Sequence, residues 1–170
     1  MIKFKDFITE EKQVGIIYHY TSIENAVRIT DSGMLRPINY EYVSFTRNKT
    51  LHITAEDSIH TECRFVVDGT KLSRNYKVTP FNYFNAPHSK YYAHDPDSDE
   101  QEERVKGAIK VFPKYVIRLE IYESDMDQIF HFSEDHEFSY LDNPEKFFKR
   151  FSNKFDLIKF FRLHYITHKV

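Results

Sequence analysis

Apolar residues are concentrated in short runs along the chain, and the spacing within each run predicts a type of element. Dense β-branched and aromatic runs predict strands. The expected strands are Val14–Thr21 (VGIIYHYT), Tyr42–Asn48 (YVSFTRN), Cys63–Gly69 (CRFVVDG) and Lys114–Glu123 (KYVIRLEIYE). The third run ends in Asp-Gly, a pair that is typical of tight turns, so we expect a turn there.

Other segments have apolar residues at helical spacing. The first helix is expected to follow an N-cap at Ser22 and to stop at Gly33, with an apolar stripe of Ala26, Val27 and Ile29. This pattern joins the first predicted strand directly to a helix.

The last predicted element is a helix that begins at Asn143-Pro144, where asparagine caps the helix and proline takes its first position. Helical spacing then runs through FFKRFSNKFDLIKFFRL. A further helix is expected at Leu51–Ile59. The segment from Thr79 to Asp99 has three prolines and no period, which predicts a long loop that could act as a lid.

Length and composition favour a single α+β domain. With 170 residues the chain can bury a core without disulfides or a structural metal. Its lone cysteine, Cys63, cannot form an internal disulfide and is expected to be a small buried residue on a strand. The 16 Phe and 12 Tyr predict a core rich in aromatic rings. No stretch resembles a transmembrane span, so no membrane partner is expected.

Charge is unevenly distributed along the chain. A net charge of −2 and a pI near 6.5 argue against a protein that coats nucleic acid by bulk attraction. Residues 95–103 include six acids, whereas from Glu145 onward seven Lys and Arg face only two acids. A solvated loop and a solvated helix face explain these segments, although the basic tail could also hold an anionic partner.

Nine histidines raise the alternative of a metal site. His164 and His168 are four residues apart and could share a helix face, and His131 and His136 flank an acidic turn. Neither pair belongs to a metal-binding signature, so no metal is predicted. The chain also lacks G-x-G-x-x-G, and a Rossmann dinucleotide site is therefore not supported.

Four motifs occur in a recognisable order: IIYHYTSIENAVRITDSGMLRP, YVSFTRN, QEERV and IKVFPKYVIRLEI. Together they resemble the signature of the ADP-ribosyltransferase fold, nearest to the DNA-targeting ADP-ribosyltransferase toxins, over roughly Ile16 to Ile121. The resemblance implies an α+β fold of two packed, mostly antiparallel sheets with flanking helices and a helical C-terminal extension. It also implies NAD as a substrate rather than a metal cofactor.

The resemblance assigns roles to individual residues. A carboxylate must stabilise the oxocarbenium-like centre that forms when the nicotinamide–ribose bond breaks, and an arginine must hold a phosphate or orient that centre. The implied catalytic candidates are Glu103, Glu102 and Arg47. The implied NAD-binding residues are His19, Tyr20, Thr21, Ser44, Thr46, Arg47 and Gln101. In this set His19 orients the ribose or the nicotinamide amide, Tyr20 stacks near the ring and Ser44 supports the glutamate. For His19 the alternative is a hydrogen-bonded core histidine, and for Arg47 it is a surface charge.

The register of the acidic motif is ambiguous, because it contains both E-x-E (Glu100, Glu102) and Q-x-E (Gln101, Glu103). The acceptor therefore stays undecided between protein and nucleic acid. If residues 101–107 form a strand, Glu103 shares a face with Val105, whereas Glu102 faces the side of the charged residues. We therefore favour Glu103 as the catalytic carboxylate.

The first ten residues, MIKFKDFITE, resemble the capsid-targeting peptides of internal head proteins in T-even-like bacteriophages. Such peptides end in Leu/Ile-x-Glu, where the prohead protease cuts, so cleavage after Glu10 would leave a domain of residues 11–170. The resemblance implies contact with the capsid scaffold and protease, a place inside the virion, and later delivery to the host cytoplasm. The alternative is an ordinary amphipathic N-terminal helix packed on its own domain.

The leading functional hypothesis is a phage-encoded, NAD-dependent ADP-ribosyltransferase that acts on a host macromolecule. A second hypothesis is a non-catalytic inhibitor or binding protein that uses the same scaffold to block a host defence factor. A third is an RNA-processing transferase of related fold, which would need a more basic cleft.

Overall fold

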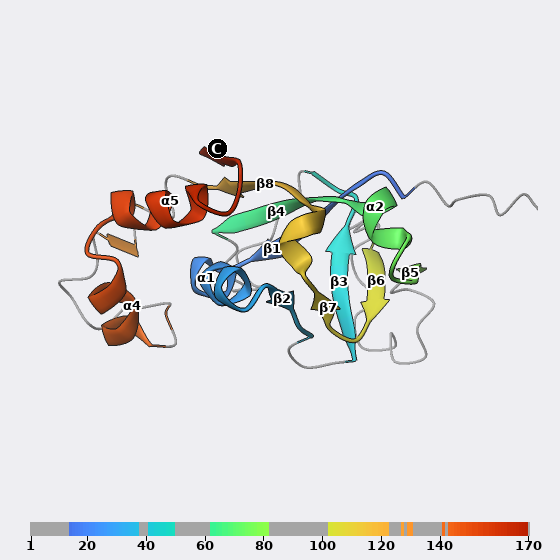
Figure 1. Cartoon of the computed structure of the whole chain (residues 1–170), viewed down its shortest axis with the longest axis horizontal. Helices are drawn as coiled ribbons and strands as arrows, with labels where there is room; N and C mark the ends of the chain where they lie inside the picture. The colour runs from blue at the N-terminus through green and yellow to red at the C-terminus, as the bar shows by residue number, and fades with distance from the viewer. Residues whose placement is uncertain are drawn as a thin grey trace, which may run out of the picture.

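Seven strands form one sheet, which runs through the middle of the protein (Figure 1). The computed structural model describes residues 14–37, 41–49, 62–81, 102–122, 127, 129–130, 141 and 143–169. Across the sheet the order is β5 (Val78–Phe81), β6 (Glu102–Lys106), β3 (Tyr42–Thr46), β1 (Ile16–Thr21), β4 (Cys63–Asp68), β8 (Val116–Ile121) and β9 (Thr167–Lys169). Neighbouring strands are antiparallel, except that β9 pairs with β8 in parallel.

A second sheet consists of β2 (Met34–Leu35) and β7 (Ile109–Lys110). The described helices are α1 (Ile23–Ser32), α2 (Gly69–Ser73), the 3-10 helix η4 (Phe112–Tyr115), α4 (Pro144–Arg150) and α5 (Lys154–Arg162). Helices and strands are therefore combined as an α+β fold requires. The larger sheet has seven strands and the smaller sheet has two.

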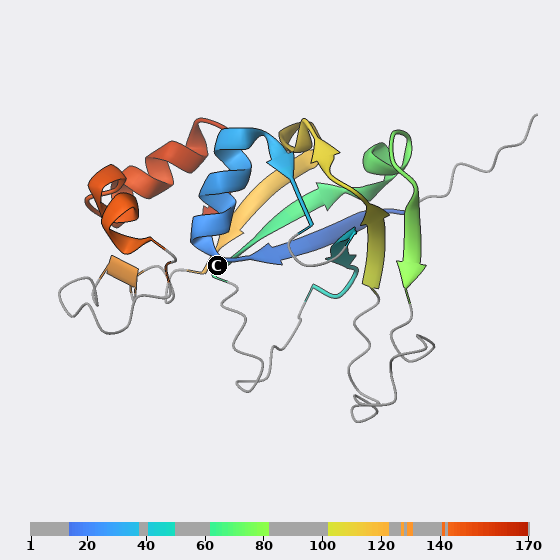
Figure 2. The ribbon, with the colours of Figure 1, turned by 90° about the horizontal axis from the view of Figure 1, so that it is seen from below.

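One face of the large sheet is covered by helices and forms the core. Apolar side chains of β1, β3, β4 and β8 pack there against α1, η4 and α5, and the buried set includes Ile17, Phe45, Phe65, Leu119, Ala26, Phe112 and Phe161. Figure 2 shows α1 lying across this face of the sheet. Helices α4 and α5 lie at one end of the molecule, and β5 and β6 lie at the other (Figure 1).

The first helix follows its predicted caps. The Ser22 hydroxyl accepts a hydrogen bond from the Asn25 backbone N–H at 3.2 Å, and Gly33 ends the helix in the left-handed region with φ of 63°. Ala26, Val27 and Ile29 are buried, as the stripe predicted. Cys63 is likewise fully buried on β4.

Two predictions around β4 and β5 were wrong. Asp68 does not open a turn, because its side chain accepts a hydrogen bond from the Lys71 N–H at 2.8 Å and thereby caps helix α2. The predicted loop starting at Thr79 is a strand as far as Phe81, since β5 pairs with β6. The rest of that predicted loop lies outside the described residues, as does the helix expected at Leu51–Ile59.

The predicted C-terminal helix is two helices. Asn143 caps α4 as expected, but the chain leaves the helix after Arg150 and Asn153 caps a second helix, with its side-chain oxygen accepting from the Phe155 N–H at 2.9 Å. His164 then lies beyond the end of α5 and His168 lies on β9, so the two histidines do not share a helix face. Strand β8 starts at Val116 because the residues before it form η4.

Candidate functional site

One row of side chains crosses the core face of the sheet. The strand registers place these residues opposite one another in the order Pro80, Glu103, Phe45, His19, Phe65 and Leu119. His19 and Phe45 are neighbours because Tyr18 pairs with Thr46 in antiparallel strands. Two polar residues, Glu103 and His19, therefore lie on either side of Phe45 on a face that is otherwise mainly apolar.

Glu103 is held by an arginine from the end of the neighbouring strand. Arg47 follows β3 directly, and its Nε and Nη2 donate to the same oxygen, Oε1 of Glu103, at 2.9 and 2.7 Å. The glutamate side chain is 3% exposed, whereas the arginine side chain is 36% exposed. The two residues are 56 positions apart in sequence. Pairing of β3 with β6 brings the buried Glu103 carboxylate and the partly exposed Arg47 guanidinium together at one end of the row.

His19 is surrounded by rings. Its ring centroid lies 5.7 Å from that of Phe45 and 6.5 Å from those of Phe65 and Phe112. Burial lowers the pKa of His19, and the carbonyl of Ser44, 3.0 Å from Nδ1, only partly offsets this. Because a carbonyl can only accept, Nδ1 carries the proton and Nε2 keeps a lone pair. A neutral imidazole with an available acceptor is therefore expected at neutral pH.

The lowered pKa of His19 predicts a pH-dependent stability. The unfolded chain binds this proton at a higher pH than the folded chain, so stability is complete above about pH 6.5 and is lost as pH falls toward the folded pKa. One such proton contributes a slope of up to about 1.4 kcal/mol per pH unit. His19→Gln is expected to have a shallower pH dependence than wild type in urea unfolding between pH 5 and 7.5. Equal slopes of unfolding free energy against pH in the variant and in wild type would contradict this prediction.

Several predicted site residues lie on the opposite face of the sheet. Adjacent residues of a strand point to opposite sides, so Tyr20, Ser44 and Thr46 face away from the row that contains Glu103. The Thr46 hydroxyl accepts from the Asn48 N–H at 2.9 Å. The structure thus places the Ser44 hydroxyl on the face opposite Glu103, so the predicted support of the glutamate by Ser44 is wrong.

Glu102 also lies on the opposite face, where it forms a two-pronged ion pair with Arg104 at 2.8 and 3.1 Å. Its cross-strand neighbour is Thr46. Thr21 is buried on the face that carries His19, and its carbonyl lies 3.4 Å from the Cys63 sulfur. Gln101 lies outside the described residues. Of the two candidate glutamates, only Glu103 contacts Arg47.

A buried charged cluster, which was not predicted from the sequence, lies on the opposite face. Arg64 of β4 donates to Glu120 of β8, which also accepts from Arg118 at 2.7 Å. Burial opposes ionisation of Glu120, yet hydrogen bonds from Arg118 and Arg64 lower its pKa. The signal in the sequence was an arginine within an otherwise apolar run, CRFVVDG.

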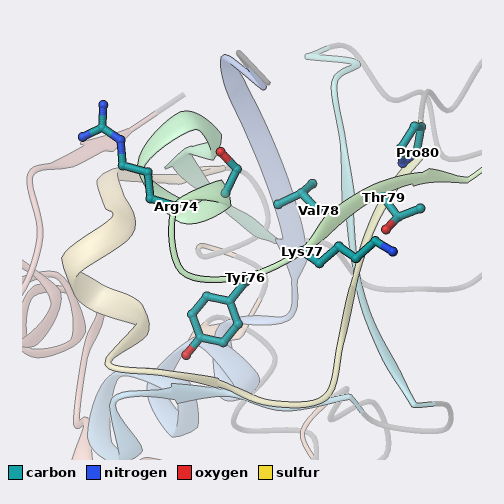
Figure 3. Close-up of a pocket in the computed structure, with 7 residues that line it drawn as sticks. Arg74, Tyr76, Lys77, Val78, Thr79 and Pro80 are labelled. Carbon is teal, nitrogen blue, oxygen red and sulfur yellow. The ribbon is translucent and has the colours of Figure 1, made fainter. Parts of the chain in front are cut away.

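An open pocket of about 570 Å³ lies beside the edge strand β5. It is lined by Ser73, Arg74, Tyr76, Lys77, Val78, Thr79 and Pro80 (Figure 3). In Figure 3 the Arg74 and Lys77 side chains point in different directions, so the two cations do not converge on one point. Pro80 is the cross-strand neighbour of Glu103, which places this pocket one strand away from the Arg47–Glu103 pair.

Within the described residues, no group of three His, Cys, Asp or Glu side chains is placed to hold a metal ion. His131 and His136 lie outside those residues. In the same part of the chain, no helix is both long and apolar enough to cross a membrane. No protein-family model matches the chain, and no curated protein matches its sequence.

Proposed function

We propose that this protein is an NAD-dependent ADP-ribosyltransferase that modifies a host macromolecule. The observation that supports the proposal most is the contact between Arg47 and Glu103, 56 residues apart in sequence, on the sheet face that also carries His19. All three residues belong to the sequence motifs that resemble the ADP-ribosyltransferase signature. Of the described glutamates of the acidic motif, Glu103 is the buried one, and Arg47 pairs with it.

The proposed reaction breaks one bond and forms another at the same carbon. The bond between C1′ of the NAD ribose and the nicotinamide nitrogen breaks, and nicotinamide leaves with the electron pair. An acceptor nucleophile then bonds to C1′ and releases its proton. Positive charge develops on the ribose as the first bond breaks, and the Glu103 carboxylate would stabilise that charge.

The other two residues would position the reactants. Arg47 fixes the Glu103 carboxylate through two hydrogen bonds to one oxygen, and its half-open side chain leaves it accessible to a phosphate of NAD. His19, neutral and with Nε2 available as an acceptor, would orient a ribose hydroxyl or the nicotinamide amide. No metal ion takes part in these steps.

Incubation of the purified protein with NAD labelled in its adenylate part, with and without host lysate, tests the proposal. We expect release of nicotinamide and transfer of the label to a lysate macromolecule, and nuclease or protease digestion then identifies the acceptor class. A folded protein that neither transfers nor hydrolyses NAD would favour the non-catalytic inhibitor instead.

The proposal includes delivery with the phage DNA. It rests on the resemblance of residues 1–10 to capsid-targeting peptides, and these residues lie outside the described part of the chain. Cleavage after Glu10 by the prohead protease would place residues 11–170 in the capsid interior and, after injection, in the host cytoplasm. An enzyme supplied in this way would act before any phage gene is expressed.

A further inference from the structure

Residues 47–49 extend beyond the end of β3, and side chains on the opposite face of the sheet hold their backbone. Arg47 follows the last residue of β3, so no strand pairing holds its backbone in the described structure. Its guanidinium nevertheless reaches a single oxygen of Glu103 with two donors, a geometry that depends on where the backbone of residues 47–49 lies. Something other than β3 must therefore fix that backbone.

Two side chains from the central strands, Tyr20 and Arg64, form hydrogen bonds with the backbone carbonyls of the residues after Arg47. The Tyr20 hydroxyl lies 2.8 Å from the Lys49 carbonyl and 3.4 Å from the Asn48 carbonyl. Arg64 Nη1 donates to the same Lys49 carbonyl and lies 2.9 Å from the Tyr20 hydroxyl. The Arg47 side chain thus lies on one face of the sheet, while the carbonyls of Asn48 and Lys49 accept hydrogen bonds from side chains on the other face.

Tyr20 and Arg64 are themselves held in place by further contacts. Arg64 donates through Nε to Glu120, and its guanidinium carbon lies 5.2, 5.6 and 5.8 Å from the ring centres of Tyr18, Tyr20 and Tyr122. Arg64 and Glu120 are 6% and 4% exposed. A buried ion pair adds little stability compared with apolar residues of similar volume, which suggests another reason for an arginine here.

We infer that Tyr20 and Arg64 are positioning residues that set the place of Arg47 against Glu103, an inference that rests on the proposed function for its catalytic consequence. Tyr20 therefore acts through Arg47 rather than by stacking on NAD. Loss of its hydroxyl leaves the ring over Arg64 but removes one of the two hydrogen bonds to the Lys49 carbonyl, so that only the bond from Arg64 Nη1 still holds it. Arg47 then samples positions in which it no longer meets the carboxylate.

Tyr20→Phe tests this directly, with Tyr18→Phe as the matched control. Tyr18 also covers Arg64 with its ring, but it lies on the other side of His19 from Tyr20 and has no described contact with residues 48–49. The first readout is hydrogen exchange of the Arg47 side-chain Nε–H by NMR, with Arg47→Lys assigning the signal. Exchange in Tyr20→Phe is expected to be at least tenfold faster than in wild type, with Tyr18→Phe unchanged.

The second readout is NAD turnover, in which Tyr20→Phe is expected to lower kcat about tenfold with KM within threefold of wild type. Unchanged exchange of the Arg47 Nε–H in Tyr20→Phe, or equally fast exchange in Tyr18→Phe, would overturn the inference. Faster exchange only in Tyr20→Phe, together with no NAD cleavage even by wild type, would support the positioning of Arg47 and overturn the proposed function. The two failures are thus distinguishable.

Discussion

Glu103→Gln is expected to reduce NAD cleavage and transfer at least 100-fold. The substitution keeps the size of the side chain and most of its hydrogen bonding, but it removes the negative charge that would face the developing positive charge on the ribose. Single turnover of labelled NAD by the purified variant measures the loss. The result is independent of acceptor identity when nicotinamide release is followed.

Glu102→Gln is the matched control for this prediction. The residue adjoins Glu103, but its side chain pairs with Arg104 on the other face of the sheet. We expect activity within threefold of wild type, because no part of the Arg47–Glu103 pair is altered. An inactive Glu102→Gln beside an active Glu103→Gln would show that the other glutamate is catalytic and that the proposed site is misplaced.

The structure also changes the stability expected for Glu103→Gln. The variant is expected to lose stability, because the side chain is 3% exposed and accepts two hydrogen bonds from Arg47. Replacing the carboxylate with a neutral amide weakens these charge-assisted hydrogen bonds, at a cost of about 1–3 kcal/mol. Urea unfolding of the variant at the assay temperature therefore accompanies the kinetics, so that activity is compared only where the variant is folded.

The orientation of Glu103 was accessible from sequence because it depends on a local rule. Alternation along residues 101–107 predicted that Glu103 shares a face with Val105, and both are buried, with exposures of 3% and 1%. The pairing of β3 with β6, which brings Arg47 to Glu103, joins segments far apart in the chain. No local pattern encodes that partner, so the contact itself was beyond sequence reasoning.

The C-terminal helix was mispredicted because periodicity outweighed a capping signal. Apolar residues keep helical spacing on both sides of Phe151–Asn153, but Asn153 is a strong N-cap residue within the pattern. Its side chain accepts from the N–H groups of Phe155 and Asp156, which starts a new helix. An asparagine within a stretch of helically spaced apolar residues is therefore also a candidate N-cap of a new helix.

The error at Asp68-Gly69 has a tertiary cause. Asp-Gly suits a hairpin turn and an N-cap equally well in sequence. In the structure the Gly69 N–H donates to the Gly15 carbonyl at 2.8 Å, and a Cβ at position 69 would lie 2.7 Å from that carbonyl oxygen. Glycine is therefore present because another part of the backbone approaches closely, and the approach follows from the pairing of β1 with β4.

Phe65→Ala is expected to have the largest effect on stability, about 3–5 kcal/mol. Phe65 is fully buried on a central strand, and its ring lies 5.4 Å from those of Phe112 and Tyr165. The substitution leaves a cavity next to His19, whose ring stacks 6.5 Å away. Water that enters this cavity would remove part of the burial that lowers the pKa of His19, so that pKa is expected to rise.

Phe155→Ala is the control, because this phenylalanine is 69% exposed on α5 and its removal should change stability by less than about 0.5 kcal/mol. Urea unfolding of both variants measures the difference, and NMR titration of the His19 ring follows the pKa. Similar losses in the two variants would contradict the assignment of the core face. A stability loss in Phe65→Ala without any rise in the His19 pKa would instead mean that the surrounding rings close over the cavity, and that His19 stays shielded from water without the Phe65 ring.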